Sequence, residues 1–138
     1  MAKDNSVIEA NRRFYAAFES LEIEQMEQVW LSDAKIICIH PGWRKLSGWG
    51  AVMQSWSRIF DSAFEMKFEV CEIEVFAGAD FAIVITEENL TQRGYDGTAK
   101  SQVLATNVFE RVGQKWLMVS HHGSPVMQPP SDDDAPLQ

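Results

Sequence analysis

Residues 100–125 read KSQVLATNVFERVGQKWLMVSHHGSP and contain two long runs of the residue types that favour strands. Val, Thr, Phe and Trp recur through Lys100–Arg111 and Lys115–Ser124, with polar residues between them. The short connection Val112-Gly113-Gln114 is typical of a hairpin turn. The stretch therefore predicts two long antiparallel strands that lie side by side.

Two more strands are predicted upstream of this hairpin. Phe81–Gln92 is joined to the next strand by Gly94-Tyr95-Asp96-Gly97, a second turn-like connection. From Phe64 onward apolar and polar residues alternate, and the alternation slips by one position near Val70-Cys71. Such a slip indicates a β-bulge, and bulges bend long strands. The second half of the chain is therefore expected to form a strongly curved, mainly antiparallel sheet.

The first half of the chain is expected to supply three helices and one strand. Apolar residues recur at helical spacing in three segments: Ser6–Leu21, Ile23–Leu31 and Gly48–Ser62. Ser6 and Glu9 have capping-box spacing, and Ser47 is expected to cap the third helix. Lys35–His40 is expected to form a buried strand. The order ααβαββββ predicts an α+β domain with three N-terminal helices packed on the curved sheet.

Length and charge limit the domain organisation and the partners. The 138 residues suffice for one core, expected over residues 6–125, with a flexible N-terminus at 1–5 and a disordered acidic, proline-rich tail at 126–138. Twelve Lys and Arg against 20 Asp and Glu give a net charge of −8. This charge argues against nucleic acid and anionic membranes as partners. The polar N-terminus shows no signal peptide, so a cytoplasmic location is expected.

The two cysteines, Cys38 and Cys71, lie in apolar strand-like runs. Their spacing matches no metal-binding or redox motif, so both are expected to be buried thiols.

Three strings of the sequence are similar to a known family: Ala34–Gly42 (AKIICIHPG), Ser47–Trp49 (SGW) and the run Ala105–Pro125. Together with the order of elements they resemble the nuclear transport factor 2-like superfamily, and more narrowly its SnoaL-like branch. The closing motif, Trp116 followed by two histidines and Gly-Ser-Pro, is also similar to the end of the association domain of calcium/calmodulin-dependent kinase II. The resemblance implies a cone-shaped α+β barrel around a small-molecule pocket, and a homodimer packed sheet to sheet.

His40 and Asn107 are candidate catalytic residues. By strand alternation His40 shares a face with Ile36 and Cys38, and an imidazole with an ordinary pKa of about 6.5 suits proton transfer at neutral pH. The resemblance to ketosteroid isomerase aligns His40 with the general base and Asn107 with the acidic donor of the oxyanion hole. The alternative for each is a structural role, as a core side chain that bonds its neighbours.

The sequence departs from the isomerase at its second oxyanion donor, a tyrosine. Phe14 occupies the matching position and cannot donate a hydrogen bond, while Tyr15 is one step around the helix and is expected to point elsewhere. Steroid isomerisation is therefore not carried over. His121 and His122 are adjacent in a strand and face opposite sides. His121 is assigned to the pocket, as the third candidate catalytic residue, and His122 to the outer face.

Six aromatic side chains are candidates to line an apolar, ligand-binding pocket: Phe14, Phe18, Trp43, Trp49, Trp56 and Phe109. The alternative is ordinary core packing, which covers Trp30 and Trp56 best. Trp43 lies in a loop beside His40 and is a candidate for the rim of the pocket. No carboxylate or third histidine has ligand-like spacing from His40 or His121, so neither a metal nor another cofactor is expected.

Two functions stay open from the sequence. The first is a small-molecule-binding protein that acts by proton transfer on a carbonyl-bearing or polycyclic metabolite, as an isomerase, cyclase, hydrolase or lyase. The second is a non-catalytic ligand-binding or oligomerisation module. The expected partners are a small apolar or aromatic ligand and a second copy of the chain, bound through the outer sheet face to which alternation assigns Trp116 and Met118.

Overall fold

The computed structural model describes the backbone of residues 2–127 and the side chains of residues 6–127. The predicted disordered tail falls, from residue 128 on, outside the described residues, and the domain limits stay a prediction. The elements follow in the order α1 (Ala2–Ser20), α2 (Ile23–Val29), β1 (Ile37–Ile39), β2 (Leu46–Ser47), α3 (Trp49–Asp61), β3 (Glu65–Ala77), β4 (Phe81–Gly94), β5 (Gly97–Val112) and β6 (Lys115–Pro125). This is the predicted order with one short strand, β2, added.

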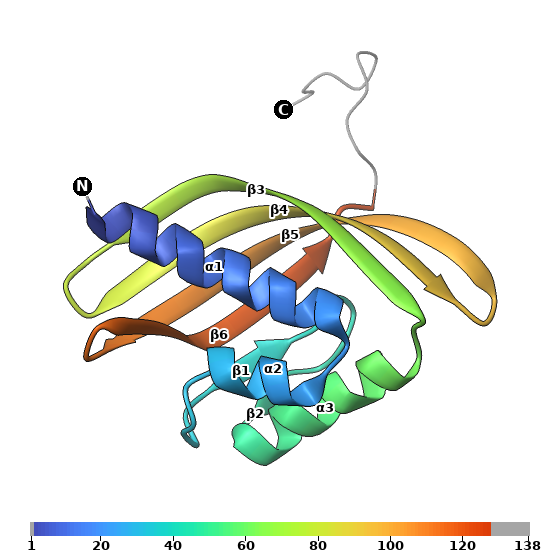
Figure 1. Cartoon of the computed structure of the whole chain (residues 1–138), viewed down its shortest axis with the longest axis horizontal. Coiled ribbons are helices and arrows are strands. Elements are labelled where there is room, and N and C mark those ends of the chain that lie inside the picture. Colours follow the sequence, from blue (N-terminus) through green and yellow to red (C-terminus); the bar gives the residue numbers. More distant parts are fainter. Residues whose placement is uncertain (1, 128–138) are drawn as a thin grey trace, which may run out of the picture.

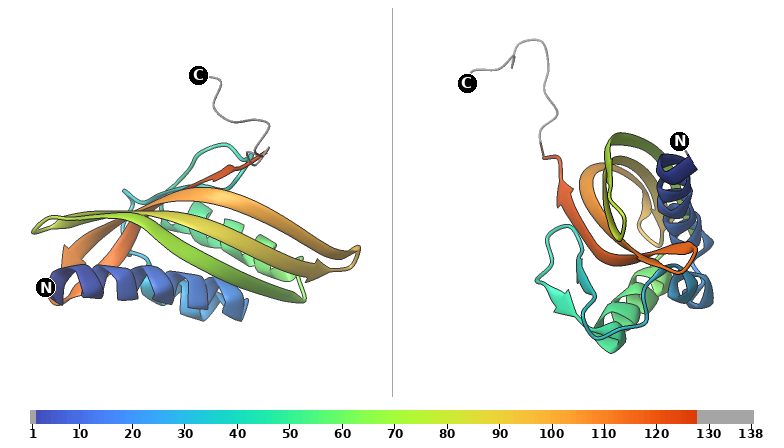
Figure 2. Two further views of the ribbon diagram at one scale, coloured as in Figure 1. Left: turned by 90° about the horizontal axis from the view of Figure 1, so that it is seen from above. Right: turned by 90° about the vertical axis from the view of Figure 1, so that its left-hand side faces the viewer.

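All the strands join one six-stranded sheet in the order β2-β1-β6-β5-β4-β3. Neighbours are antiparallel except β1 and β6, which run parallel. The long strands bend over the helices, which lie on the concave side (Figures 1 and 2). The predicted α+β class, with three helices on a curved and mainly antiparallel sheet, is confirmed. The sheet stays open, however, and does not close into the predicted barrel. None of the described helices is long and apolar enough to span a bilayer.

Two helix starts differ from the prediction. α1 begins at Ala2, so Ser6 lies inside the helix and the predicted capping box is wrong. The Ser6 hydroxyl instead accepts a hydrogen bond from the Trp116 indole at 3.2 Å. Gly48, not Ser47, precedes α3, and its φ of 89° is a left-handed conformation that favours glycine. β1 is also shorter than the predicted strand Lys35–His40.

Two bulges bend the sheet. In β3, Glu72 pairs with Thr86 and Glu74 with Ile85, so Ile73 is the extra residue. The predicted slip in β3 therefore exists, but it lies beyond Val70-Cys71. The second bulge was not predicted: Ser120 pairs with Val108 and Met118 with Phe109, which leaves Val119 as the extra residue in β6.

The bulge at Val119 reverses the predicted faces of the first part of β6. Trp116 and Met118 are buried in the core, so their assignment to the outer face is wrong. His121, beyond the bulge, is also buried, whereas His122 is exposed, as predicted. One extra residue thus places Trp116, Met118 and His121 on the same inward side.

The two cysteines lie in different environments. Cys38 is buried on β1, as expected, and burial raises the pKa of its thiol. Cys71 is exposed, because its position on β3 faces away from the helices, so the prediction of a buried thiol is wrong there.

A close contact holds the loop after β1 against β6. A Cβ atom at Gly123 would lie 3.1 Å from side-chain atoms of Pro41 and Val103, a separation that needs neighbours to move. Glycine at this position therefore lets Pro41 approach the sheet. The contact positions His40, the residue before Pro41, beside the inward face of β6.

Candidate functional site

A cluster of polar side chains is buried in the otherwise apolar core. Its members are Asn11, His40, Ser55, Thr86, Glu88, Asn107 and His121. They come from α1, the end of β1, α3 and the adjacent strands β4, β5 and β6. A buried polar group destabilises the fold unless it is hydrogen-bonded. The hydrogen-bond partners of each group therefore show which atoms carry a proton and which accept one.

Asn107 is the centre of the cluster. Its side-chain amide donates to the Asn11 Oδ1 at 2.9 Å and to the Tyr15 hydroxyl oxygen at 3.1 Å. Its Oδ1 lies 2.6 Å from Nδ1 of His121, which pairs with Asn107 across β5 and β6. Because Oδ1 can only accept, the His121 Nδ1 carries the proton and Nε2 keeps its lone pair. Burial, with smaller contributions from the nearby His40 and His122, lowers the pKa of His121 to about 3, so this imidazole is neutral at pH 7.

Tyr15 reaches the same cluster, and the prediction that it points elsewhere is wrong. Its hydroxyl donates to the Glu88 carboxylate at 2.5 Å, and both side chains are buried. Burial raises the pKa of Glu88 to about 7, against a smaller lowering by the Tyr15 hydrogen bond. Burial, and then the Glu88 charge, raises the pKa of Tyr15 well above 10.0. Phe14 is buried as well, so neighbouring positions of α1 both face the interior.

His40 is held from α3. Its Nε2 lies 2.9 Å from the Ser55 hydroxyl oxygen, and that hydroxyl donates to the Val52 carbonyl at 2.6 Å. Since the Ser55 proton is used there, the His40 Nε2 is the donor of the first bond, and Nδ1 keeps its lone pair as an acceptor. The Cys38 Sγ lies 3.9 Å from this Nδ1 and 3.6 Å from Nε2. Burial lowers the pKa of His40 to about 4, which makes it neutral at pH 7.

Aromatic rings surround the two imidazoles. The Trp56 ring centroid lies 4.7 Å from that of His40 and 6.0 Å from that of His121, and Phe14 lies 4.9 Å from His121. Trp43, 41% exposed, covers His40 from outside at 4.8 Å, as a rim residue would. Phe18 contacts Trp56 at 4.7 Å. The ring contacts among the described residues do not include Trp49 or Phe109, although both pack in or against the core.

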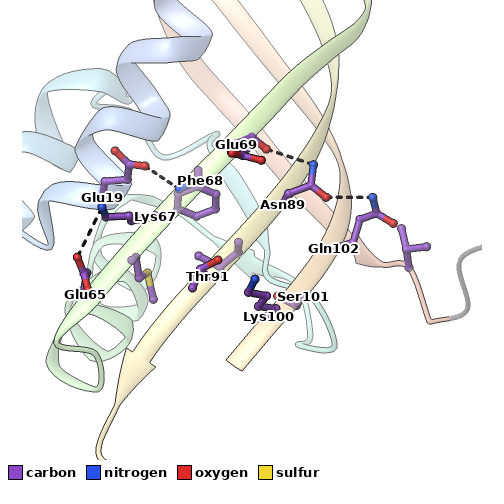
Figure 3. Close-up of a pocket in the computed structure, with 13 residues that line it drawn as sticks. Glu19, Glu65, Lys67, Phe68, Glu69, Asn89, Thr91, Lys100, Ser101 and Gln102 are labelled. Carbon is purple, nitrogen blue, oxygen red and sulfur yellow. Dashed lines mark hydrogen bonds and ion pairs between the residues drawn. The ribbon is translucent and has the colours of Figure 1, made fainter. Parts of the chain in front are cut away.

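A groove of about 1050 Å³ lies beside the cluster, at the start of β3, the later part of β4 and the early part of β5 (Figure 3). Its lining is mixed, with Phe68 and Leu90 beside Glu19, Lys67 and Lys100, and it does not contain His40, Asn107 or His121. Phe68 separates the groove from the cluster, because its ring lies 5.3 Å from the Tyr15 ring and 4.5 Å from the Phe18 ring. Its backbone N–H is held by the Glu19 carboxylate at 2.7 Å.

Sequence reasoning missed four members of the cluster, Asn11, Ser55, Thr86 and Glu88, and it missed Tyr15, which is hydrogen-bonded to the cluster. Two signals were present. Thr86 and Glu88 continue the inward alternation that begins with Ala82 and Val84, and Asn11 interrupts the apolar stripe of α1. A polar residue in the inward phase of a strand indicates a buried hydrogen-bond network or a site. Among residues 6–127, no three His, Cys, Asp or Glu side chains gather as a metal site requires.

The chain belongs to the SnoaL-like domain family, whose pattern it matches over residues 7–128. It is 33% identical to a candidate dehydratase of the nuclear transport factor 2-like family from Streptomyces avermitilis, with a TM-score of 0.86 over 92% of this chain and 98% of that one. It is 39% identical to a candidate calcium/calmodulin-dependent protein kinase type II association domain from Thiobacillus denitrificans. That match has a TM-score of 0.77 and covers 86% of this chain and 93% of the other.

A curated relative gives a third comparison. The chain is 29% identical over 123 residues to the F-box protein SKIP8 of Arabidopsis thaliana. The match covers 89% of this chain and 51% of SKIP8, so the chain spans about half the length of that relative.

Proposed function

We propose that the protein binds a small carbonyl compound in its interior and transfers a proton on it without a cofactor, in an isomerase- or lyase-type reaction. The observation that carries this proposal is His40: a buried, neutral imidazole whose Nε2 is committed to Ser55 and whose Nδ1 keeps its lone pair. The family and the relative assigned as a candidate dehydratase support a reaction of this class.

The chemistry asked of His40 is removal of a proton next to a carbonyl group. The Nδ1 lone pair takes the proton, the electrons of the C–H bond move into the C–C–O system, and an enolate forms. Return of the same proton to another carbon gives an isomerase, and its transfer to a departing β-hydroxyl group releases water and gives a dehydratase. A pKa of about 4 is adequate for this role, because ketosteroid isomerase uses a carboxylate with a pKa of about 4.6.

Asn107 and His121 have positioning roles in this proposal. The Asn107 amide donates to Asn11 and Tyr15, and its oxygen orients His121. His121 then presents a neutral ring next to Trp56. Phe14, Phe18, Trp43 and Trp56 are proposed to contact an apolar or aromatic ligand, whereas Trp49 and Phe109 support the core around it.

Replacing His40 by glutamine is expected to slow proton abstraction on the order of 100-fold. The measurement is deuterium incorporation next to the carbonyl of 1-tetralone, 2-tetralone and 1-indanone in D₂O, followed by NMR. The wild-type rate is expected to rise as pH increases through about 4, where His40 loses its proton, and to be constant above that. Arg44→Gln, an exposed change in the same loop, is the matched control. Equal rates for wild type and His40→Gln, or no rate above buffer with any of the three ketones, contradict the proposal.

A second candidate function, an oligomerisation module, is supported by the outer face of the sheet. Phe76 and Ile83 pair across β3 and β4 on this face, and Leu104 lies on β5; all three are exposed. We infer that this face packs against a second copy of the chain. Trp116 and Met118 do not belong to it, because both are buried in the core. The similarity to the association domain from Thiobacillus denitrificans supports the same inference.

Ile83→Glu is expected to halve the mass measured by light scattering after size exclusion, because it places a charge in the centre of the proposed interface. Glu27→Lys, on the exposed surface of α2, is the control and should leave the mass unchanged. A wild-type monomer at all concentrations contradicts the dimer.

A further inference from the structure

The Trp56 indole has a hydrogen-bond donor without a partner. Trp56 is fully buried, and no group among residues 6–127 accepts a hydrogen bond from its Nε1. Trp116, by contrast, donates its indole N–H to Ser6. A buried donor without an acceptor is destabilising, and most buried polar groups have a partner. An unpaired donor beside polar groups that are all paired therefore needs an explanation.

The position of this donor points to a ligand. The Trp56 ring contacts the rings of both His40 and His121, at 4.7 and 6.0 Å, and these two imidazole rings lie 6.5 Å from each other. The other donors of the cluster are committed: His40 donates to Ser55, His121 to Asn107, and Tyr15 to Glu88. The Trp56 N–H, on a ring that contacts both imidazoles, is therefore a donor that a bound molecule can engage without breaking an existing hydrogen bond.

We propose that the Trp56 indole N–H binds the oxygen of a neutral ketone or aldehyde and orients its α-carbon toward His40. This inference rests on the proposed function and deepens it, because it specifies the substrate class and the group that holds the reacting oxygen.

The substrate class, a neutral ketone or aldehyde, follows from the charges around the site. The aromatic and imidazole rings in contact with the Trp56 ring are those of Phe14, Phe18, His40, Phe60 and His121. Both imidazoles are neutral at pH 7, so none of these five rings carries a positive charge to balance a carboxylate or phosphate. A neutral carbonyl oxygen needs only a donor, and the aromatic walls favour a flat, apolar body. Negative charge that develops on the oxygen as the proton leaves strengthens the same hydrogen bond.

The test compares 1-tetralone with tetralin, which has the same ring system but no oxygen. Nitrogen-15 labelling resolves the indole N–H signals of the five tryptophans, and Trp56→Phe assigns the signal of Trp56. Titration with 1-tetralone is expected to shift the Trp56 N–H signal downfield as a hydrogen bond forms. Tetralin, which has no oxygen, is expected to cause no downfield shift. Trp56→Phe is expected to weaken 1-tetralone binding about 5- to 10-fold and to change tetralin binding less than 2-fold.

Trp30→Phe is the matched control. Trp30 is also buried with an unpartnered Nε1, but it contacts neither His40 nor His121 among the described ring contacts. It is expected to leave both affinities unchanged, and circular dichroism checks that both variants fold. An unchanged Trp56 signal at millimolar 1-tetralone, or an equal loss of affinity for 1-tetralone and tetralin in Trp56→Phe, overturns the inference. If binding depends on Trp56 but deuterium exchange does not depend on His40, the results support this inference and contradict the proposed catalysis.

Discussion

Glu88→Gln is expected to become increasingly stabilising as pH rises, by about 3 kcal/mol between pH 4.5 and pH 8 relative to wild type. In the unfolded chain Glu88 ionises near its ordinary pKa of 4.5, but in the folded protein only near 7, because burial disfavours its charge. The folded state therefore binds more protons between these values. Rising pH lowers wild-type stability through this window, and the effect is complete above pH 7. Glutamine does not titrate and can still accept the Tyr15 hydrogen bond.

Urea unfolding of both proteins at several pH values measures this difference. Glu69→Gln, an exposed change on β3, is the control, because water solvates that carboxylate in both states. Tyr15→Phe provides a second check: it removes the hydrogen bond that lowers the pKa of Glu88, so the loss of stability should continue to higher pH. A variant-to-wild-type difference that stays constant from pH 4.5 to 8 contradicts the buried, proton-holding state of Glu88.

Asn107→Ala is expected to reduce the free energy of unfolding by about 4 kcal/mol. The change leaves the Asn11 Oδ1 without its Asn107 donor and the His121 Nδ1–H without its acceptor, and it opens a cavity at a fully buried position. Thr106→Ala, an exposed position of the same strand, should cost under about 0.5 kcal/mol. Both values come from urea unfolding at pH 7. A loss below about 1.5 kcal/mol for Asn107→Ala would show that the network around Asn107 is not a structural unit.

The long strands were predictable because their turns are local. Gly94 pairs with Gly97 around Tyr95-Asp96, and Val112 pairs with Lys115 around Gly113-Gln114, as the sequence indicated. The Val119 bulge was not predictable, because no residue type requires a bulge at that position. Strand alternation therefore assigned the wrong face to Trp116 and Met118 while it assigned the right one to His121.

The candidate site was predictable in part. The inward positions of His40, Asn107 and His121 follow from strand alternation, and the structure joins them through the Trp56 ring and the Asn107 hydrogen bonds. Tyr15 was not predicted because its position, one helical step from Phe14, points its side chain in a different direction. The side chain is nevertheless long enough for its hydroxyl to reach Glu88. Glu88 was not predicted because a glutamate is rarely buried without a partner, and the sequence does not show which residue is that partner. That partner is Tyr15, 73 positions away in the chain.

The bulge in β6 has a consequence for the two adjacent histidines. If β6 paired regularly through Val119, the inward phase set by Trp116 and Met118 would continue through Ser120 to His122, and His121 would face out. An imidazole therefore faces the interior near this end of β6 in either register. Deletion of Val119 removes the extra residue without changing which side His121 faces. By strand alternation, loss of the bulge is therefore expected to keep His121 inside, whereas an insertion between Ser120 and His121 is expected to turn His121 outward and His122 inward.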